Sequence, residues 1–77
     1  MPSDIKQYNE AGDADGYWEI YYSNGQLDFK GTYINGLRHG LWETYLFNGE
    51  LYFKGRYEIG KPVGYWVYFY CKIFYAD

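Results

Sequence analysis

The sequence predicts an all-β fold, a single elongated and twisted antiparallel meander of about six strands, built from stacked β-hairpin repeats of 24 residues. Three observations lead to this prediction. A residue pattern recurs at a fixed step, apolar and polar residues alternate within each unit, and turn-forming residues separate the alternating runs. No segment has a persuasive helical period, and 77 residues make at most one domain.

The repeat is clearest in the first four residues of each unit. Gly-Tyr-Trp-Glu at 16–19 recurs as Gly-Leu-Trp-Glu at 40–43 and as Gly-Tyr-Trp-Val at 64–67, a step of 24 residues both times. Counting back by the same step places a degenerate half-repeat strand in the acidic N-terminal segment. The predicted bounds are 1–15 for this segment and 16–77 for the repeat array, with units at 16–39, 40–63 and 64–77 (partial).

Each expected strand follows from alternation or from its place in the unit. In the first whole unit, Leu27, Phe29 and Tyr33 fall on one face, while Asp28 and Lys30 fall on the other. This period of two is typical of a strand with two different faces. The expected strands span, in order, residues 4–9, 16–22, 26–33, 40–47, 50–57 and 64–74.

The turns are expected to be of two kinds. Asn-Gly at 24–25 and at 48–49 predicts tight type I′ turns, because that turn needs positive φ at both central residues. The connections between units suit looser turns, and Pro62 is placed in one of them because proline harms a central strand. The last unit has Lys-Ile at 72–73 in place of Asn-Gly, so its hairpin is expected to stay open.

Two glycines fall in the middle of expected strands, where glycine costs stability. Gly31 and Gly55 occupy equivalent positions in successive units. The expected reason is space, because a ring from a neighbouring strand needs to lie over the backbone there. The three tryptophans keep the register of the repeat, so they are interpreted as its packed signature rather than as stacking platforms for nucleic-acid bases.

These motifs resemble those of MORN repeats. The shared pattern is Gly-x-Trp-x-x-Tyr, then Asn-Gly-x-Leu, then Gly-x-Tyr and a further Gly, over about residues 16–70. The pattern is most similar to the bacterial MORN-variant repeats of antitoxin-like proteins. The resemblance implies stacked β-hairpins in one twisted sheet, no catalytic residues, and binding that inhibits or neutralises a partner.

Composition argues against several classes of protein. A net charge of -3 has the wrong sign for a nucleic-acid binder and is too weak for a nucleic-acid mimic. A lone Cys71 excludes an internal disulfide and fits a reducing compartment. The sequence shows no signal peptide and no apolar run of membrane-spanning length, so a cytoplasmic protein is expected.

No set of residues predicts catalysis, a metal or a cofactor. His39 has no counterpart in the other units and no nucleophile to activate, so an ordinary surface residue is expected. Cys71 lies in an apolar run and is expected to pack as a small hydrophobic residue. Glu10, Asp13 and Asp15 lack the spacing of a calcium loop, so a solvated acidic connection is expected.

Lysine recurs once per unit, at Lys6, Lys30 and Lys54. Either this row steers an acidic partner, or its members are solvated strand residues balanced across strands by acids such as Glu19 and Glu43. The sequence leaves both interpretations open, with the second favoured.

The leading hypothesis for function is a non-enzymatic protein–protein interaction module. It would be a small inhibitor or neutraliser of a partner protein, either antitoxin-like or a phage-encoded inhibitor of a host defence enzyme. Tyrosine and arginine dominate interface hot spots, so the face that mixes them with charges is the expected partner site. Its residues are Tyr17, Tyr21, Lys30, Tyr45, Lys54, Arg56, Tyr65 and Phe69.

The alternative is a peripheral membrane or lipid-binding MORN-type adaptor. That function needs a basic face, and seven bases against ten acids make it the weaker hypothesis. No nucleic-acid partner is expected.

The end of the chain predicts self-association. The run from Tyr65 to Tyr75 is apolar on both faces, with Lys72 as its only charge, and is expected to form the edge strand. Exposed apolar edges pair with other chains, so a homodimer through this strand, or strand addition by the partner, is expected. The residues expected to mediate this contact are Val67, Phe69, Cys71 and Ile73.

Overall fold

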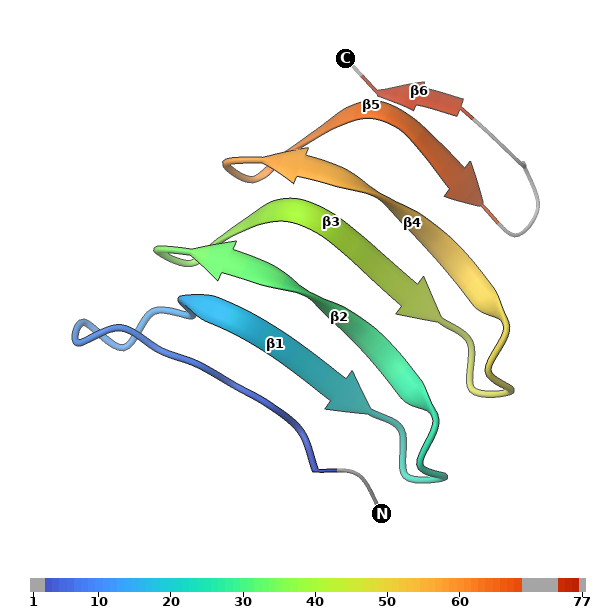
Figure 1. Ribbon diagram of the computed structural model, residues 1–77, viewed down its shortest axis with the longest axis horizontal. Helices are drawn as coiled ribbons and strands as arrows, with labels where there is room; N and C mark the ends of the chain where they lie inside the picture. Colours follow the sequence, from blue (N-terminus) through green and yellow to red (C-terminus); the bar gives the residue numbers. More distant parts are fainter. Residues whose placement is uncertain (1–2, 69–73, 77) are drawn as a thin grey trace.

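The computed structural model describes residues 3–68 and 74–76, which form one six-stranded antiparallel sheet. Its strands are β1 (Gly16–Tyr21), β2 (Leu27–Ile34), β3 (Leu37–Tyr45), β4 (Leu51–Glu58), β5 (Lys61–Tyr68) and β6 (Phe74–Ala76). Each strand pairs with its neighbours in the sequence, so the sheet is an open meander (Figure 1). The predicted all-β hairpin meander is therefore confirmed. Among the described residues, no helix is long and apolar enough to cross a membrane.

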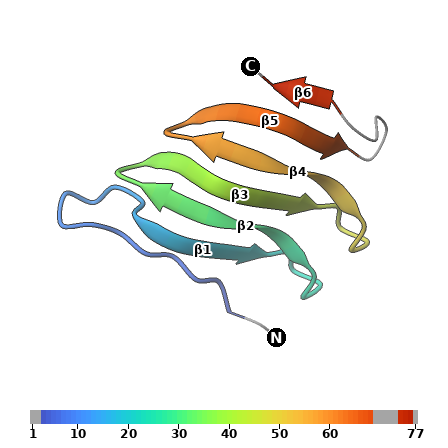
Figure 2. The same cartoon turned by 45° about the horizontal axis from the view of Figure 1, so that its top comes forward.

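The sheet is a single layer with two open faces. The molecule measures 38 × 33 × 11 Å, and the shortest dimension leaves no room for a second packed layer (Figure 2). Trp42 and Trp66, at 4% and 2% exposure, are the buried hydrophobic side chains of the described part. The core is therefore a row of rings on one side of the sheet.

Each of these two tryptophans lies over a glycine of the preceding strand, which we call its glycine seat. A Cβ placed on Gly31 would lie 2.2 Å from the Trp42 ring, and one on Gly55 would lie 2.1 Å from the Trp66 ring. Each indole thus lies directly over the backbone of the preceding strand. The predicted reason for the two mid-strand glycines is confirmed.

Rings from successive strands then join the tryptophans into one row. Tyr33 meets Trp42 edge to face with centroids 4.9 Å apart, and Tyr57 meets Trp66 in the same way at 5.0 Å. Arg38 stacks on Tyr57 at 4.7 Å and so belongs to this row. We call this side the Trp face, defined by Trp18, Phe29, Tyr33, Trp42, Phe53, Tyr57, Trp66 and Tyr68.

The two kinds of turn are the reverse of the prediction. The connections between units are the tight ones, because Asn35 (φ 48) and Gly36 (φ 85) alone join β2 to β3, and Ile59 (φ 46) and Gly60 (φ 83) join β4 to β5. The turn at Asn24 is longer. The Asn24 side chain accepts a hydrogen bond from the Gln26 N–H at 3.0 Å, and the residue after Asn24, rather than Asn24 itself, has positive φ.

Tight turns between units make two strands start earlier than expected. β3 begins at Leu37 rather than at residue 40, and β5 begins at Lys61 rather than at residue 64. Pro62 therefore lies inside β5, opposite Tyr57, and not in a connection. It is tolerated because it adjoins the turn and precedes Gly64, where the pairing of β5 with β6 begins.

The last hairpin closes, contrary to the prediction. Gly64, Tyr65 and Trp66 of β5 pair antiparallel with β6, so residues 64–74 do not form one continuous edge strand. A long apolar edge leaves main-chain donors and acceptors unpaired, and folding back satisfies those of β5 at this point.

The predicted strand at 4–9 is also wrong. This segment makes only isolated bridges, between Ile5 and Glu19 and between Tyr8 and Ala14. It runs along the free edge of β1 (Figure 1), where the Gln7 carbonyl accepts the Trp18 indole N–H at 2.9 Å. It therefore covers the open edge where a further hairpin would otherwise pack.

Candidate protein-binding face

The side opposite the Trp face carries the residues predicted to bind a partner. A row of directly paired residues crosses five strands in the order Glu19, Lys30, Glu43, Lys54 and Val67. Directly paired residues share a face, so this row fixes the side on which its neighbours lie. We call it the mixed face, defined by Tyr17, Glu19, Tyr21, Lys30, Leu41, Glu43, Tyr45, Lys54, Arg56, Val63, Tyr65 and Val67.

The first unit is internally satisfied. Tyr17 and Tyr21 both donate hydroxyl hydrogen bonds to the Glu19 carboxylate, at 2.5 and 2.6 Å. These two bonds hold the pKa of Glu19 below its usual range. Burial, followed by the bond to Glu19, raises the pKa of Tyr17 to about 12. Both tyrosines are therefore fixed in place and stay neutral at physiological pH.

Glu43 of the second unit neutralises Lys30 of the first unit. The Glu43 carboxylate accepts the Tyr45 hydroxyl at 2.7 Å and lies 3.6 Å from the Lys30 ammonium. The bond to Glu43 raises the pKa of Tyr45 to about 12. Lys30 therefore belongs to a satisfied cluster, and Tyr45 is anchored beside it.

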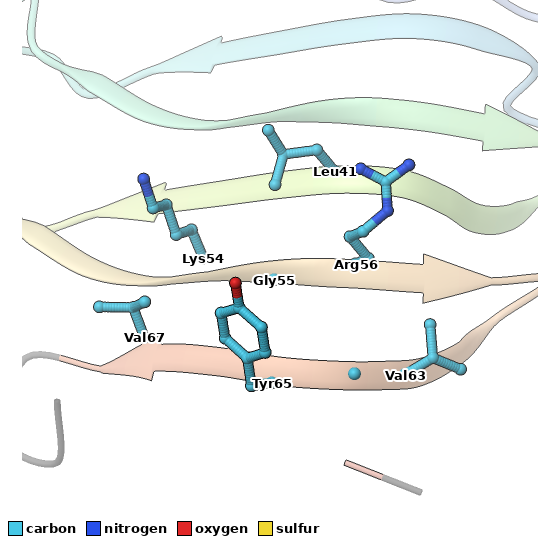
Figure 3. A pocket seen from close by; sticks show the side chains of 8 residues that line it. Leu41, Lys54, Gly55, Arg56, Val63, Tyr65 and Val67 are labelled. Carbon is cyan, nitrogen blue, oxygen red and sulfur yellow. The ribbon is translucent and has the colours of Figure 1, made fainter. Parts of the chain in front are cut away.

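A groove lies next to this cluster, over β3, β4 and β5 (Figure 3). It encloses about 280 Å³ and is lined by Leu41, Lys54, Gly55, Arg56, Val63, Gly64, Tyr65 and Val67. Lys54 and Arg56 rise from β4 on either side of Gly55, and Tyr65 points between them from β5. Tyr65 and Leu41 are 61% and 48% exposed, so apolar surface here is open to contact.

Neither cation of the groove forms an ion pair with a described residue. Within residues 3–68 and 74–76, no carboxylate lies within 4 Å of the charged nitrogens of Lys54 or Arg56. The register explains this for Arg56, which lies between Leu41 on β3 and Val63 on β5. Lys54 faces Val67 on β5, at the position where the preceding unit has a glutamate.

Seven of the eight predicted partner-binding residues thus lie on one face, and Phe69 falls outside the described residues. Sequence reasoning missed Val63, because it placed that residue in a connection. The alternation of Val63 with Tyr65 and Val67 is the signal that identifies it as part of the same strand face.

The self-association residues have a different outcome. Val67 lines the groove, while Cys71 and Ile73 lie outside the described residues. The expected unpaired edge is wrong at residues 64–66, since β6 pairs there. Dimerisation through the end of the chain stays a prediction.

The described residues present charged, hydroxyl and apolar groups on the mixed face. They contain no cluster of three His, Cys, Asp or Glu side chains able to hold a metal ion. His39 Nδ1 accepts the Ile59 main-chain N–H at 3.2 Å and so supports the tight turn between β4 and β5. The mixed face can therefore offer cations, hydroxyl groups and apolar contact to a ligand.

Comparisons with protein-family models, curated proteins and solved structures gave no match. The functional interpretation therefore depends on the geometry of the mixed face.

Proposed function

We propose that this chain is a non-enzymatic protein-binding module that holds a partner protein against its mixed face. The observation that carries the proposal is the open groove, in which two cations outside any ion pair of the described residues flank exposed apolar side chains. A concave, largely apolar surface with a few convergent polar groups is the default candidate for a binding site.

The composition of the face supports a protein as the partner. Tyrosine and arginine are enriched at interface hot spots, because they combine large contact area with hydrogen bonding. Tyr17, Tyr21 and Tyr45 are already held by glutamates, so binding would cost little of their side-chain entropy. The 38 × 33 Å outline of the sheet also exceeds the roughly 800 Å² per partner of a standard interface.

The Trp face is the poorer candidate for a binding site. Its two central tryptophans are buried by neighbouring rings, and Arg38 is stacked on Tyr57. The polar group of Trp42 is also hydrogen-bonded within the sheet, since its indole N–H donates to the Thr32 carbonyl at 3.0 Å. This face serves mainly to stabilise the sheet.

The consequence of binding is proposed to be inhibition or neutralisation of the partner. This follows the resemblance of the repeat to MORN-variant antitoxin-like proteins, and a phage-encoded inhibitor of a defence enzyme would fit the same surface. Lipid binding is not proposed, because membrane-binding patches gather about four to eight basic residues, whereas the groove has two.

Site-specific photo-crosslinking in cells of the native host tests which face binds. A benzophenone amino acid replaces Tyr65 in the groove. As a matched control it replaces Tyr8, which lies beside Trp18 and has a similar exposed fraction of 57%. We expect one protein to crosslink at position 65 and not at position 8, and its activity to fall when the unmodified chain is added. Crosslinking at position 8 alone, or at neither position, would contradict the proposal.

A further inference from the structure

The groove differs from its counterpart in the first unit by two charges. One repeat later, Lys30 of β2 is kept as Lys54 of β4, whereas Thr32 becomes Arg56 and Glu43 of β3 becomes Val67 of β5. Lys30 is flanked by Glu19 and Glu43 on its two neighbouring strands. Lys30 can therefore be compared directly with Lys54, because the charge of Lys30 is neutralised within the sheet.

Lys54 and Arg56 lack such neutralisation. Among the residues that the structure describes, the only acid paired with either is Glu43, opposite Lys54, and this carboxylate already binds Lys30 and the Tyr45 hydroxyl. Both cationic side chains are exposed, whereas Lys30 is half-buried. The second unit thus presents two cations outside any ion pair of the described residues, whereas the first presents one lysine paired with Glu43.

We propose that the groove binds an acidic segment of the partner protein, with one carboxylate on Lys54 and a second on Arg56. This inference rests on the proposed function and names the chemistry of the partner. Apolar side chains of the same segment contact Tyr65, Val63 and Leu41, which surround the two charges.

The spacing of the two cations indicates the conformation of that segment. Residues two apart on a strand are roughly 7 Å apart, and Lys54 and Arg56 have this relation on β4. An extended chain with acids at alternate positions repeats its carboxylates at the same interval. Arg56 can bind its carboxylate through two parallel hydrogen bonds, which sets the direction of approach.

A polyanion such as single-stranded nucleic acid fits the charges less well. Its backbone needs a continuous row of cations, but the row that contains Lys54 alternates with Glu43 and Glu19. The chain also carries a net charge of -3, which repels a polyanion at long range. A short acidic segment meets the two cations and avoids most of this repulsion.

NMR titration of the isotope-labelled full chain tests the inference with defined probes. The main probe is an end-blocked peptide that alternates glutamate with valine. A peptide of the same composition with its glutamates grouped together, and an oligothymidylate, serve as comparisons. We expect the alternating peptide to shift the amide signals of Lys54, Arg56 and Tyr65, and to bind more tightly than either comparison.

Charge variants give the decisive measurement. Replacing Lys54 and Arg56 together, by Glu or by the milder Gln, should weaken peptide binding about tenfold, as expected for the loss of two exposed ion pairs. Lys6→Gln, in the exposed N-terminal segment along β1 and outside the mixed face, is the control and should change the affinity less than about twofold. The Gln variant keeps the side-chain size and so maintains the test if the Glu variant folds poorly.

Several results would overturn the inference. These are no binding of the alternating peptide, equal binding of the grouped peptide or the oligothymidylate, or equal effects of the Lys6 and groove variants. If the crosslinker at Tyr65 still captures a protein in that case, the binding face stands and only the acidic segment is wrong.

Discussion

Gly55→Ala tests the packing principle of the whole sheet. The added Cβ would lie 2.1 Å from Trp66 Cδ2 and 2.3 Å from Cε2. Carbon atoms in contact prefer about 3.5–4.0 Å, so the indole would have to move by more than 1 Å. It has no room to do so, because the ring is 2% exposed and contacts Phe53 and Tyr57.

The expected cost follows from the area of the ring. Full expulsion of a tryptophan returns on the order of 200 Å² to water, which corresponds to about 5 kcal/mol. Partial displacement of Trp66 should cost about 3 kcal/mol, the upper end of typical overpacking effects. A domain of 77 residues has a free energy of unfolding of roughly 4–12 kcal/mol. The variant should therefore lose much of its stability.

Thermal unfolding and tryptophan fluorescence provide the assay. Each kcal/mol shifts the Tm of a domain this small by about 4–8 °C, so Gly55→Ala should lower the Tm by more than 10 °C (roughly 12–24 °C) and shift the emission to longer wavelength. The matched control is Gly40→Ala, whose Cβ would meet nothing within 4 Å. Gly40 has φ +78, so the control should lose only about 1–2 kcal/mol through backbone strain. Equal melting of the two variants, with unshifted emission, would refute the glycine-seat explanation.

Three further predictions concern the turn, the tyrosines and the N-terminal segment. Ile59→Asn should raise the free energy of unfolding by about 1 kcal/mol, because a branched residue at φ 46 is strained and asparagine tolerates that region; an unchanged Tm would show that the strain is not significant. Stability should fall as pH rises from 10 to 12, because Tyr45 has a pKa of about 12 when folded and 10.0 when unfolded, so the unfolded state loses its proton first. Tyr45→Phe should reduce that fall, and an identical alkaline melting profile would contradict the assignment. Deleting residues 1–8 should cost about 1–2 kcal/mol in chemical denaturation, since Trp18 loses a hydrogen bond and an aromatic neighbour, whereas deleting 1–3 should cost little; equal stabilities would exclude the covering role of this segment.

The sequence by itself determined the fold class and the packing units. A 24-residue step with alternating residues leaves one arrangement in which every unit forms the same hairpin. The glycine seats followed from the same logic, because Gly31 and Gly55 keep a fixed offset from the tryptophans. The composition of the mixed face was also readable, since side chains alternate strictly between the two faces of a strand.

Turn geometry was decided only in the folded chain. Asn-Gly occurs at 24–25, 35–36 and 48–49, and only the pair at 35–36 has positive φ at both positions. Ile59 even adopts this conformation at the equivalent place in the second unit, against its own preference. The pairing of β4 with β5 imposes that turn, so local residue preference was a poor guide there.

The candidate binding groove was likewise decided by tertiary structure. The sequence shows two lysines at equivalent positions, Lys30 and Lys54, and could not rank them. Register separates them, because one is flanked by two glutamates and the other faces Val67 across β5. Closure of the last hairpin is a further case, since it depends on pairing between 64–66 and 74–76. A charge or a strand edge becomes available for binding according to what lies beside it in the sheet, and that neighbour is set by long-range pairing rather than by local sequence.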